Sequence, residues 1–239
     1  SQSYLEALEP WEFVFEKGPL SMSRVYTDGA WMFETLIQKE TDAAKKKEYF
    51  DKLMSIYDKR LANLDALNSF ATPKTTSTKG NIICRKAYDY YYFCPTMDSE
   101  TAYKMFKEGI NDMGPNTEAF VLFYFIECSY NRFRNNTDAR EDFIKDYMTC
   151  SDICDKLLEQ AKEYAETDTI QAQKIVNNYQ PTQDKCHDLF VKSGAADCAA
   201  LEKIYTQKVE ANKTDLAYLN GVLQILTKFE CDTTSIYYL

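Results

Sequence analysis

The chain has 239 residues, only seven glycines and six prolines, and a formal net charge of −9. So few glycines and prolines argue against an all-β fold with its frequent tight turns. The acidic balance argues against nucleic acid as a partner, because phosphate recognition requires clustered Lys and Arg. The longest apolar run, residues 119–126, falls far short of the roughly 20 residues that span a bilayer.

The first residues differ in pattern from the rest of the chain. Residues 1–28 hold Pro10, Gly18 and Pro19 around two apolar clusters, and we expect an irregular leader packed on the first helix. The polar Ser-Gln-Ser opening is typical of a mature end just past a cleavage or lipidation site. We therefore expect any membrane attachment only through a removed or lipidated N-terminus. One helical repeat domain is expected over 29–239, with a loop at 68–80 whose Pro, Ser, Thr and Gly residues leave little to bury.

The remainder predicts about ten helices joined by short turns. Apolar residues at helical spacing place these helices over residues 29–38, 42–64, 82–93, 100–113, 116–135, 138–165, 168–179, 182–192, 197–211 and 216–229. Four Thr-Asp pairs supply the N-caps that helices prefer, at Thr41-Asp42, Thr137-Asp138, Thr167-Asp168 and Thr214-Asp215. Pro181 is expected to interrupt the pattern. A further helix begins near residue 233, so we expect the native chain to continue past Leu239, or this segment to dock as a stub.

Small and aromatic residues within 83–110 recur at a characteristic spacing. Ile83, Ala87 and Tyr90 are followed on the next helix by small or apolar residues at Ala102, Phe106, Gly109 and Ile110. This pattern resembles the tetratricopeptide repeat, whose paired helices have a period of about 34 residues. The resemblance implies an all-α fold of stacked antiparallel hairpins that form a right-handed superhelix.

At finer grain the chain is similar to exported tetratricopeptide-containing envelope proteins of Bacteroidetes. The similarity is carried by Pro19, Tyr26 and Gly29, by residues 53–60 (LMSIYDKR), by Gly80 with Arg85-Lys86-Ala87, and by Cys198 with Cys231-Asp232. It implies an exported protein, often a lipoprotein, that is periplasmic or associated with the outer membrane. The biochemical role of such proteins is generally unassigned. They tend to carry more regular repeats after the Cys-Asp segment, and this chain lacks them.

The eight cysteines leave three interpretations open. Their spacing contains no Cys-x-x-Cys pair. A disulfide such as Cys198–Cys231 joins neighbouring helices about one repeat apart, and it requires an oxidising compartment. A zinc site from Cys150, Cys154, Cys186 and the single histidine, His187, requires two helices to meet. The third interpretation is that most of these cysteines are small buried hydrophobes. We expect no metal and no cofactor.

An aromatic run supplies three ligand-binding candidates, Tyr88, Tyr91 and Tyr92. Tyrosine is amphipathic and common at interfaces, and a row of tyrosines can stack sugars or peptide side chains. A helix must divide such a run between its core and its surface, so core packing is the competing interpretation for each ring.

Asp58 and Arg60 are the other ligand-binding candidates. Both lie late in a long predicted helix, next to Tyr57. The competing interpretation is structural, with Tyr57 in the core and Arg60 paired with an acid on the adjacent helix.

The catalytic motifs of hydrolases, metalloproteases and nucleotide-binding enzymes are missing from the sequence. We therefore expect a non-catalytic interaction or scaffold module of the bacterial cell envelope that binds a partner segment in a helical groove. One alternative is a carbohydrate-binding accessory protein, which requires exposed, coplanar tyrosines along one groove. Another is an acid/base hydrolase, which requires convergent carboxylates with shifted pKa values in a cleft.

Overall fold

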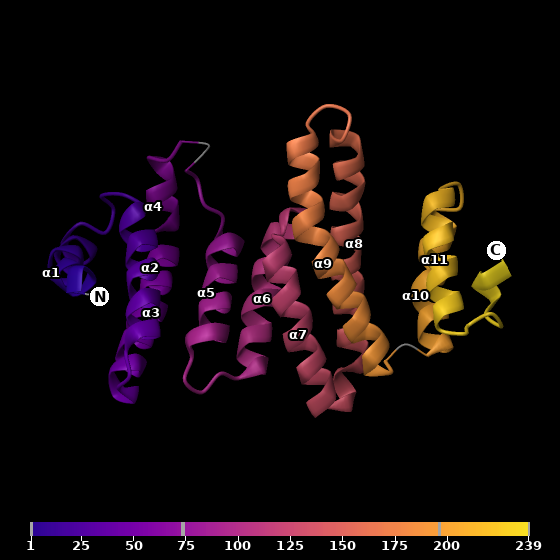
Figure 1. Ribbon diagram of the computed structural model, residues 1–239, viewed down its shortest axis with the longest axis horizontal. Coiled ribbons are helices and arrows are strands. Elements are labelled where there is room, and N and C mark those ends of the chain that lie inside the picture. The colour runs from indigo at the N-terminus through magenta and orange to yellow at the C-terminus, as the bar shows by residue number, and fades with distance from the viewer. Residues whose placement is uncertain (1, 73–74, 196, 239) are drawn as a thin grey trace. The chain divides into compact units, whose positions relative to one another are not determined.

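The computed structural model of the protein describes residues 2–72, 75–195 and 197–238. Within these residues all regular structure is helical, which confirms the all-α class (Figure 1). Eleven α-helices lie in the described part of the chain. The chain divides into two compact units, Ser1–Cys128 and Ser129–Leu239, where the sequence suggested one domain over 29–239. Each unit is described separately.

Unit 1 is built from helices that pack with their neighbours in sequence. Its elements are α1 (Gln2–Lys17), α2 (Arg24–Lys39), α3 (Ala43–Ala62), α4 (Leu64–Ser69), α5 (Lys79–Phe93), α6 (Ser99–Met113), the 3₁₀ turn η1 (Gly114–Asn116) and the first part of α7 (Ala119–Asn135). Helix α2 packs with α3 and α5 packs with α6. Their apolar faces enclose a core that includes the fully buried Tyr26, Leu53 and Ile56.

The leader expected to be irregular instead forms helix α1, despite Pro10 within it. Trp11 and Phe15 stand four residues apart on one face, and their rings stack with centroids 4.7 Å apart. The indole Nε1 of Trp11 donates to the Val25 carbonyl at 2.8 Å. At Gly29 an added Cβ would lie 2.4 Å from Trp11 Cζ2, so the ring rests directly on the backbone of α2. Burial of these rings offsets the hydrogen bond that Pro10 removes.

Small residues allow α5 and α6 to approach closely, as the repeat-like spacing predicted. Ala87 and Ala102 are fully buried. At Gly109 an added Cβ would lie 2.3 Å from Cys84 Sγ and 2.9 Å from the Gly80 carbonyl oxygen. The two helices therefore meet backbone to backbone at this crossing, and only glycine fits there.

Three of the four Thr-Asp pairs cap helices as predicted. The carboxylates of Asp42, Asp168 and Asp215 each accept the backbone N–H three residues further on. The prediction at Thr137-Asp138 is wrong, because a 3₁₀ turn occupies these residues and the Asn136 side chain caps it instead. Helix α8 then begins without a side-chain cap.

The loop expected at 68–80 lies between α4 and α5, and both helices extend slightly into it. Residues 73–74 fall outside the described residues. The amide of Asn68 donates to the Ser77 carbonyl at 2.8 Å and accepts from the Ser77 N–H at 3.1 Å. The Thr78 hydroxyl then caps α5. These local hydrogen bonds, not apolar burial, order the described parts of the loop.

Unit 2 centres on a long helical hairpin followed by a shorter one. Its elements are the end of α7, the 3₁₀ turn η2 (Thr137–Ala139), α8 (Arg140–Tyr164), α9 (Thr169–Ser193), α10 (Cys198–Ala211), α11 (Leu216–Lys228) and the 3₁₀ turn η3 (Ser235–Tyr238). The Tyr147 ring on α8 stacks on the Phe190 ring on α9, with centroids 3.8 Å apart and planes 2° apart. Phe229, just past α11, packs edge-on against Phe190 at 5.9 Å.

Pro181 does not interrupt the helix as predicted, because α9 runs through it to Ser193. Pro181 has no N–H to donate to the carbonyl of Asn177, four residues earlier. Both residues lie on the exposed face of α9. The opposite face carries the buried Ile175 and Cys186. Water can therefore solvate the freed carbonyl, while packing against α8 keeps the helix continuous.

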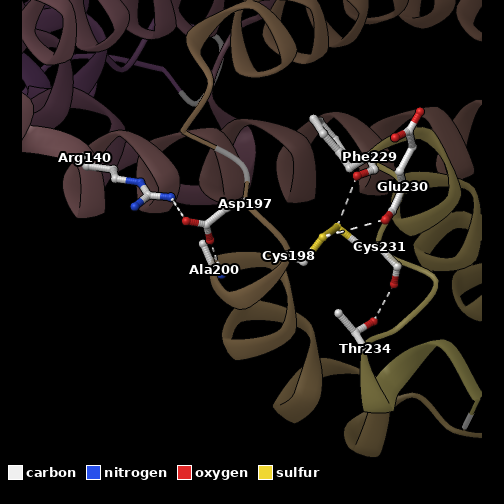
Figure 2. The surroundings of a disulfide bond; sticks show 8 residues. All are labelled: Arg140, Asp197, Cys198, Ala200, Phe229, Glu230, Cys231 and Thr234. Atoms are coloured by element: carbon white, nitrogen blue, oxygen red, sulfur yellow. Dashed lines mark hydrogen bonds and ion pairs between the residues drawn. A yellow bond between two sulfur atoms is a disulfide. The ribbon is translucent and has the colours of Figure 1, made fainter.

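The structure joins Cys198 and Cys231 in a disulfide with a Cα–Cα distance of 5.2 Å (Figure 2). It links the first residue of α10 to the segment that follows α11. Beside it, Asp197 pairs with Arg140 at 2.5 Å and accepts the Ala200 N–H at 2.8 Å. The hydrogen bond from Arg140 lowers the pKa of the Asp197 carboxyl. The disulfide and the Arg140–Asp197 ion pair together fix the position at which the α10–α11 hairpin begins.

The last segment docks on α10. The residues expected to begin a helix form the 3₁₀ turn η3. The Ser235 N–H and hydroxyl both donate to Glu202 Oε1, at 2.9 and 2.5 Å. These hydrogen bonds lower the pKa of the Glu202 carboxyl.

Replacing both Cys198 and Cys231 by serine is expected to lower the unfolding free energy by about 3–4 kcal/mol, because the bridge closes a long loop in the unfolded chain. Urea unfolding with and without a thiol reductant measures the effect. The reductant should destabilise the parent protein and leave the double variant unchanged. Denatured protein should titrate six thiols before reduction and eight after it; eight thiols before reduction contradict the bridge.

Gly109→Ala is expected to lower the unfolding free energy by about 1–3 kcal/mol, because its methyl group would overlap Cys84 and the backbone at Gly80. Gly221→Ala is the matched control, since no atom lies within 4 Å of a Cβ placed there in α11. The control should be neutral or stabilising by about 0.5–1 kcal/mol. Equal losses in both variants would show that α5 and α6 do not cross so closely.

Candidate binding groove

Helices α8, α9, α10 and α11 of unit 2 line an open groove of about 1240 Å³. Its lining runs over residues 147–162 of α8, 180–188 of α9 and 212–225 on the side of α11, with Tyr205 from α10. Helices α8 and α9 have 25 residues each, whereas α10 and α11 have 14 and 13. The long hairpin and the short one are therefore unequal walls of one open channel.

Tyrosines and the single histidine form part of the groove lining. Tyr147 and Tyr205 are buried and Tyr218 is half-buried. The Tyr147 hydroxyl lies 3.2 Å from Nδ1 of His187. The Tyr218 hydroxyl is buried without a hydrogen-bond partner among the described residues. Burial raises the pKa of all three tyrosines, to about 12 at Tyr218, so the hydroxyls stay protonated.

Carboxylates are the most numerous charged groups in the lining. Six acidic side chains line the groove: Asp152, Asp155, Glu159, Asp184, Asp188 and Asp215. Among the residues whose side chains are described, they face two lysines, Lys156 and Lys162, which gives these groups a net charge of −4 with His187 neutral. Lys162 pairs with Glu159 at 2.6 Å. Hydrogen bonding from Gln183 and Ser151 orients Asp155.

The zinc candidates divide between the hairpin core and the groove. Cys150 and Cys154 are buried in the hairpin. Cys186 is also buried but belongs to the groove lining, as does His187 beside Tyr147. Burial raises the pKa of Cys150 and Cys154, which favours the neutral thiol over the thiolate that binds metal. Within the described ranges no three His, Cys, Asp or Glu side chains are arranged to hold a metal ion.

The tyrosine candidates form an aromatic cluster in unit 1. Tyr88, Tyr91 and Tyr92 on α5 surround Tyr124 on α7, and Tyr91 donates to Glu127 at 2.8 Å. The rings tilt against one another by 46–77°. Among the four, Tyr92 is the most exposed, at 50%. The rings pack edge to face, so these four do not form the coplanar platform that the carbohydrate alternative requires.

Asp58 and Arg60 each have a structural partner. Asp58 on α3 forms an ion pair with Lys86 on α5. Arg60 donates to the Ser77 hydroxyl at 2.9 Å, and burial lowers the pKa of its guanidinium. Tyr57 lies in the core as expected, but the expected acid partner of Arg60 is replaced by a hydroxyl. Neither residue contributes to the groove, which belongs to unit 2.

The sequence did not indicate one pair of neighbouring carboxyl groups in unit 1, Asp89 and Glu34. Asp89 on α5 is only 3% exposed and accepts the Tyr57 hydroxyl at 2.6 Å. Burial, followed by the neighbouring Glu34 carboxylate, raises the pKa of Asp89 to about 8, and burial also raises the pKa of Glu34. The spacing of residues along α5 does indicate that Asp89 is buried. Asp89 lies seven residues after the fully buried Ile82, and therefore on the same face of the helix.

Compared with known proteins, the chain matches no family model, no curated protein and no solved structure. No helix in the described part of the chain is both long enough and apolar enough to cross a membrane.

The unfolding free energy is expected to fall as pH rises from about 4 to about 8, at up to about 1.4 kcal/mol per pH unit. In this range folded Asp89, facing Glu34, Tyr57 and Arg85, keeps a proton that the unfolded chain has released. Urea unfolding across this range measures the slope. Asp89→Asn should flatten the pH dependence of the unfolding free energy, while its amide oxygen still accepts a hydrogen bond from the Tyr57 hydroxyl.

Asp58→Asn is the control for this slope, because it removes an exposed carboxylate on α3. It should leave the pH profile of the parent protein unchanged. A parent profile that is flat between pH 4 and pH 8 would contradict the retention of a proton by folded Asp89.

Proposed function

We propose that this protein is a non-catalytic binding module of the bacterial cell envelope, which holds a segment of a partner protein in the groove of unit 2. The observation that carries the proposal is the groove of about 1240 Å³ with tyrosines and carboxylates in its lining. The half-buried Tyr218 suits a protein interface, since a tyrosine offers large contact area and a hydrogen-bonding hydroxyl.

The size of the groove favours a chain segment over a small molecule. Sites for small ligands are usually about 300–1,000 Å³ and enclose most of the ligand. This groove is larger and has walls from four helices. An extended peptide or one face of a helix fits such a channel and contacts its walls over several residues.

Paired helices support the further proposal of a tetratricopeptide-type arrangement. The pairs α2 with α3, α5 with α6, and α8 with α9 follow one another along the chain. Close approach at Gly80 and Gly109 fits the small-residue packing of such repeats. Export, lipoprotein character and a place in the envelope rest on the sequence resemblance, and they belong to the proposal.

A binding role also fits the position of the carboxyl pair better than hydrolysis does. Acid/base catalysis requires its carboxyl groups to reach substrate. Asp89, whose pKa is raised to about 8, is buried against Tyr57 inside unit 1. The open groove lies in unit 2. The raised pKa at Asp89 is therefore assigned to packing between helices.

A photocrosslinking amino acid at Gln180 is expected to capture one discrete protein from native envelopes, since Gln180 lines the groove and is exposed. Lys174 is the matched control, because it is exposed on the same helix and lies outside the groove lining. Gel analysis and mass spectrometry of the adducts provide the measurement. The same adducts from both positions, or none from Gln180, would contradict a partner in the groove.

A further inference from the structure

We propose that the partner segment is cationic, with Lys or Arg side chains that enter the groove between its tyrosines and its carboxylates. This inference rests on the proposed function and adds the chemistry of the partner.

The charge of the lining selects the sign of the occupant. Six carboxylates and two lysines line one channel among the described side chains, and one of those lysines, Lys162, is paired with Glu159. A segment rich in Asp or Glu would meet like charge along three helices, which costs free energy wherever water is displaced. A cationic segment gains from the same arrangement, and more so where the groove shields it from solvent.

Polar groups from three helices line the channel. Asp152 and Asp155 on α8, Tyr205 on α10 and Tyr218 on α11 all belong to its lining. Burial, followed by the carboxylates of Asp152 and Asp155, raises the pKa of Tyr218 to about 12. A Lys or Arg side chain in this channel therefore has carboxylate acceptors on α8 and, at Tyr218, a hydroxyl that has no other partner among the described residues.

Tyr218 gives the channel an aromatic ring that is only half-buried. An ammonium or guanidinium group over a tyrosine face is attracted by the ring quadrupole, and the attraction grows as water is excluded. Lys and Arg also carry aliphatic stems that pack on apolar surface, which Val222 and Ile225 of α11 provide here. The groove thus offers apolar contact for the stem and carboxylates for the charge.

The test uses the full chain and short fluorescein-labelled peptides in which Lys alternates with Ser. Matched probes carry Glu or Ser in place of every Lys. Fluorescence anisotropy should show saturable binding of the lysine peptide, weaker binding of the serine peptide and none of the glutamate peptide. Added salt should weaken the lysine complex. Equal affinity for the lysine and serine peptides would overturn the inference.

Two double variants locate the binding. Asp152→Asn with Asp155→Asn should weaken the lysine peptide by about tenfold or more. Glu141→Gln with Glu166→Gln removes the same charge from exposed positions of unit 2 outside the groove lining, and should change affinity by less than about twofold. Equal weakening by both pairs would assign the binding to net charge and contradict the site. Circular dichroism confirms that each variant is folded.

The outcomes separate this inference from the proposed function. If a protein is captured through Gln180 but the lysine peptide is not preferred, the proposed binding function stands and the proposal of a cationic segment is rejected. Selective lysine binding without any capture through Gln180 would keep the cation site and reject the protein partner. Failure of both measurements rejects both proposals.

Discussion

The side chain of Phe190 is the point at which the helices of unit 2 meet. It is fully buried, stacks on Tyr147 from α8 and receives the edge of Phe229 from the end of α11. Aromatic contacts of this kind combine large apolar burial with a preferred ring geometry. The two hairpins therefore share one core at this level. The same stack holds the Tyr147 hydroxyl toward His187 in the lining of the groove.

The groove results from helices of unequal length that share one core around Phe190. Because α10 and α11 are about half as long as α8 and α9, the long hairpin presents surface that the shared core does not cover. The Cys198–Cys231 bond and the Arg140–Asp197 pair fix the start of the short hairpin. A rigid frame lowers the entropy cost of ordering the walls when a segment binds.

Acidic residues serve opposite purposes in the two units. Asp89 in unit 1 is removed from water and keeps its proton, so it acts as a hydrogen-bonding core group between helices. The six carboxylates around the unit 2 groove include several on exposed positions, such as Asp152 and Asp184. The overall charge of −9 is therefore only part of the electrostatic description. Its distribution over the helices decides what each unit can bind.

The sequence by itself determined the helical class, most helix limits and the close crossing at Gly109, because caps, apolar period and residue size act over a few residues. Tertiary structure decided the rest. Packing on α2 made the leader helical around Pro10, and packing on α8 carried α9 through Pro181. The groove brings Tyr147, Asp184 and Tyr218 together from three helices. Such a site depends on how helices distant in sequence are placed, and no local pattern encodes that placement.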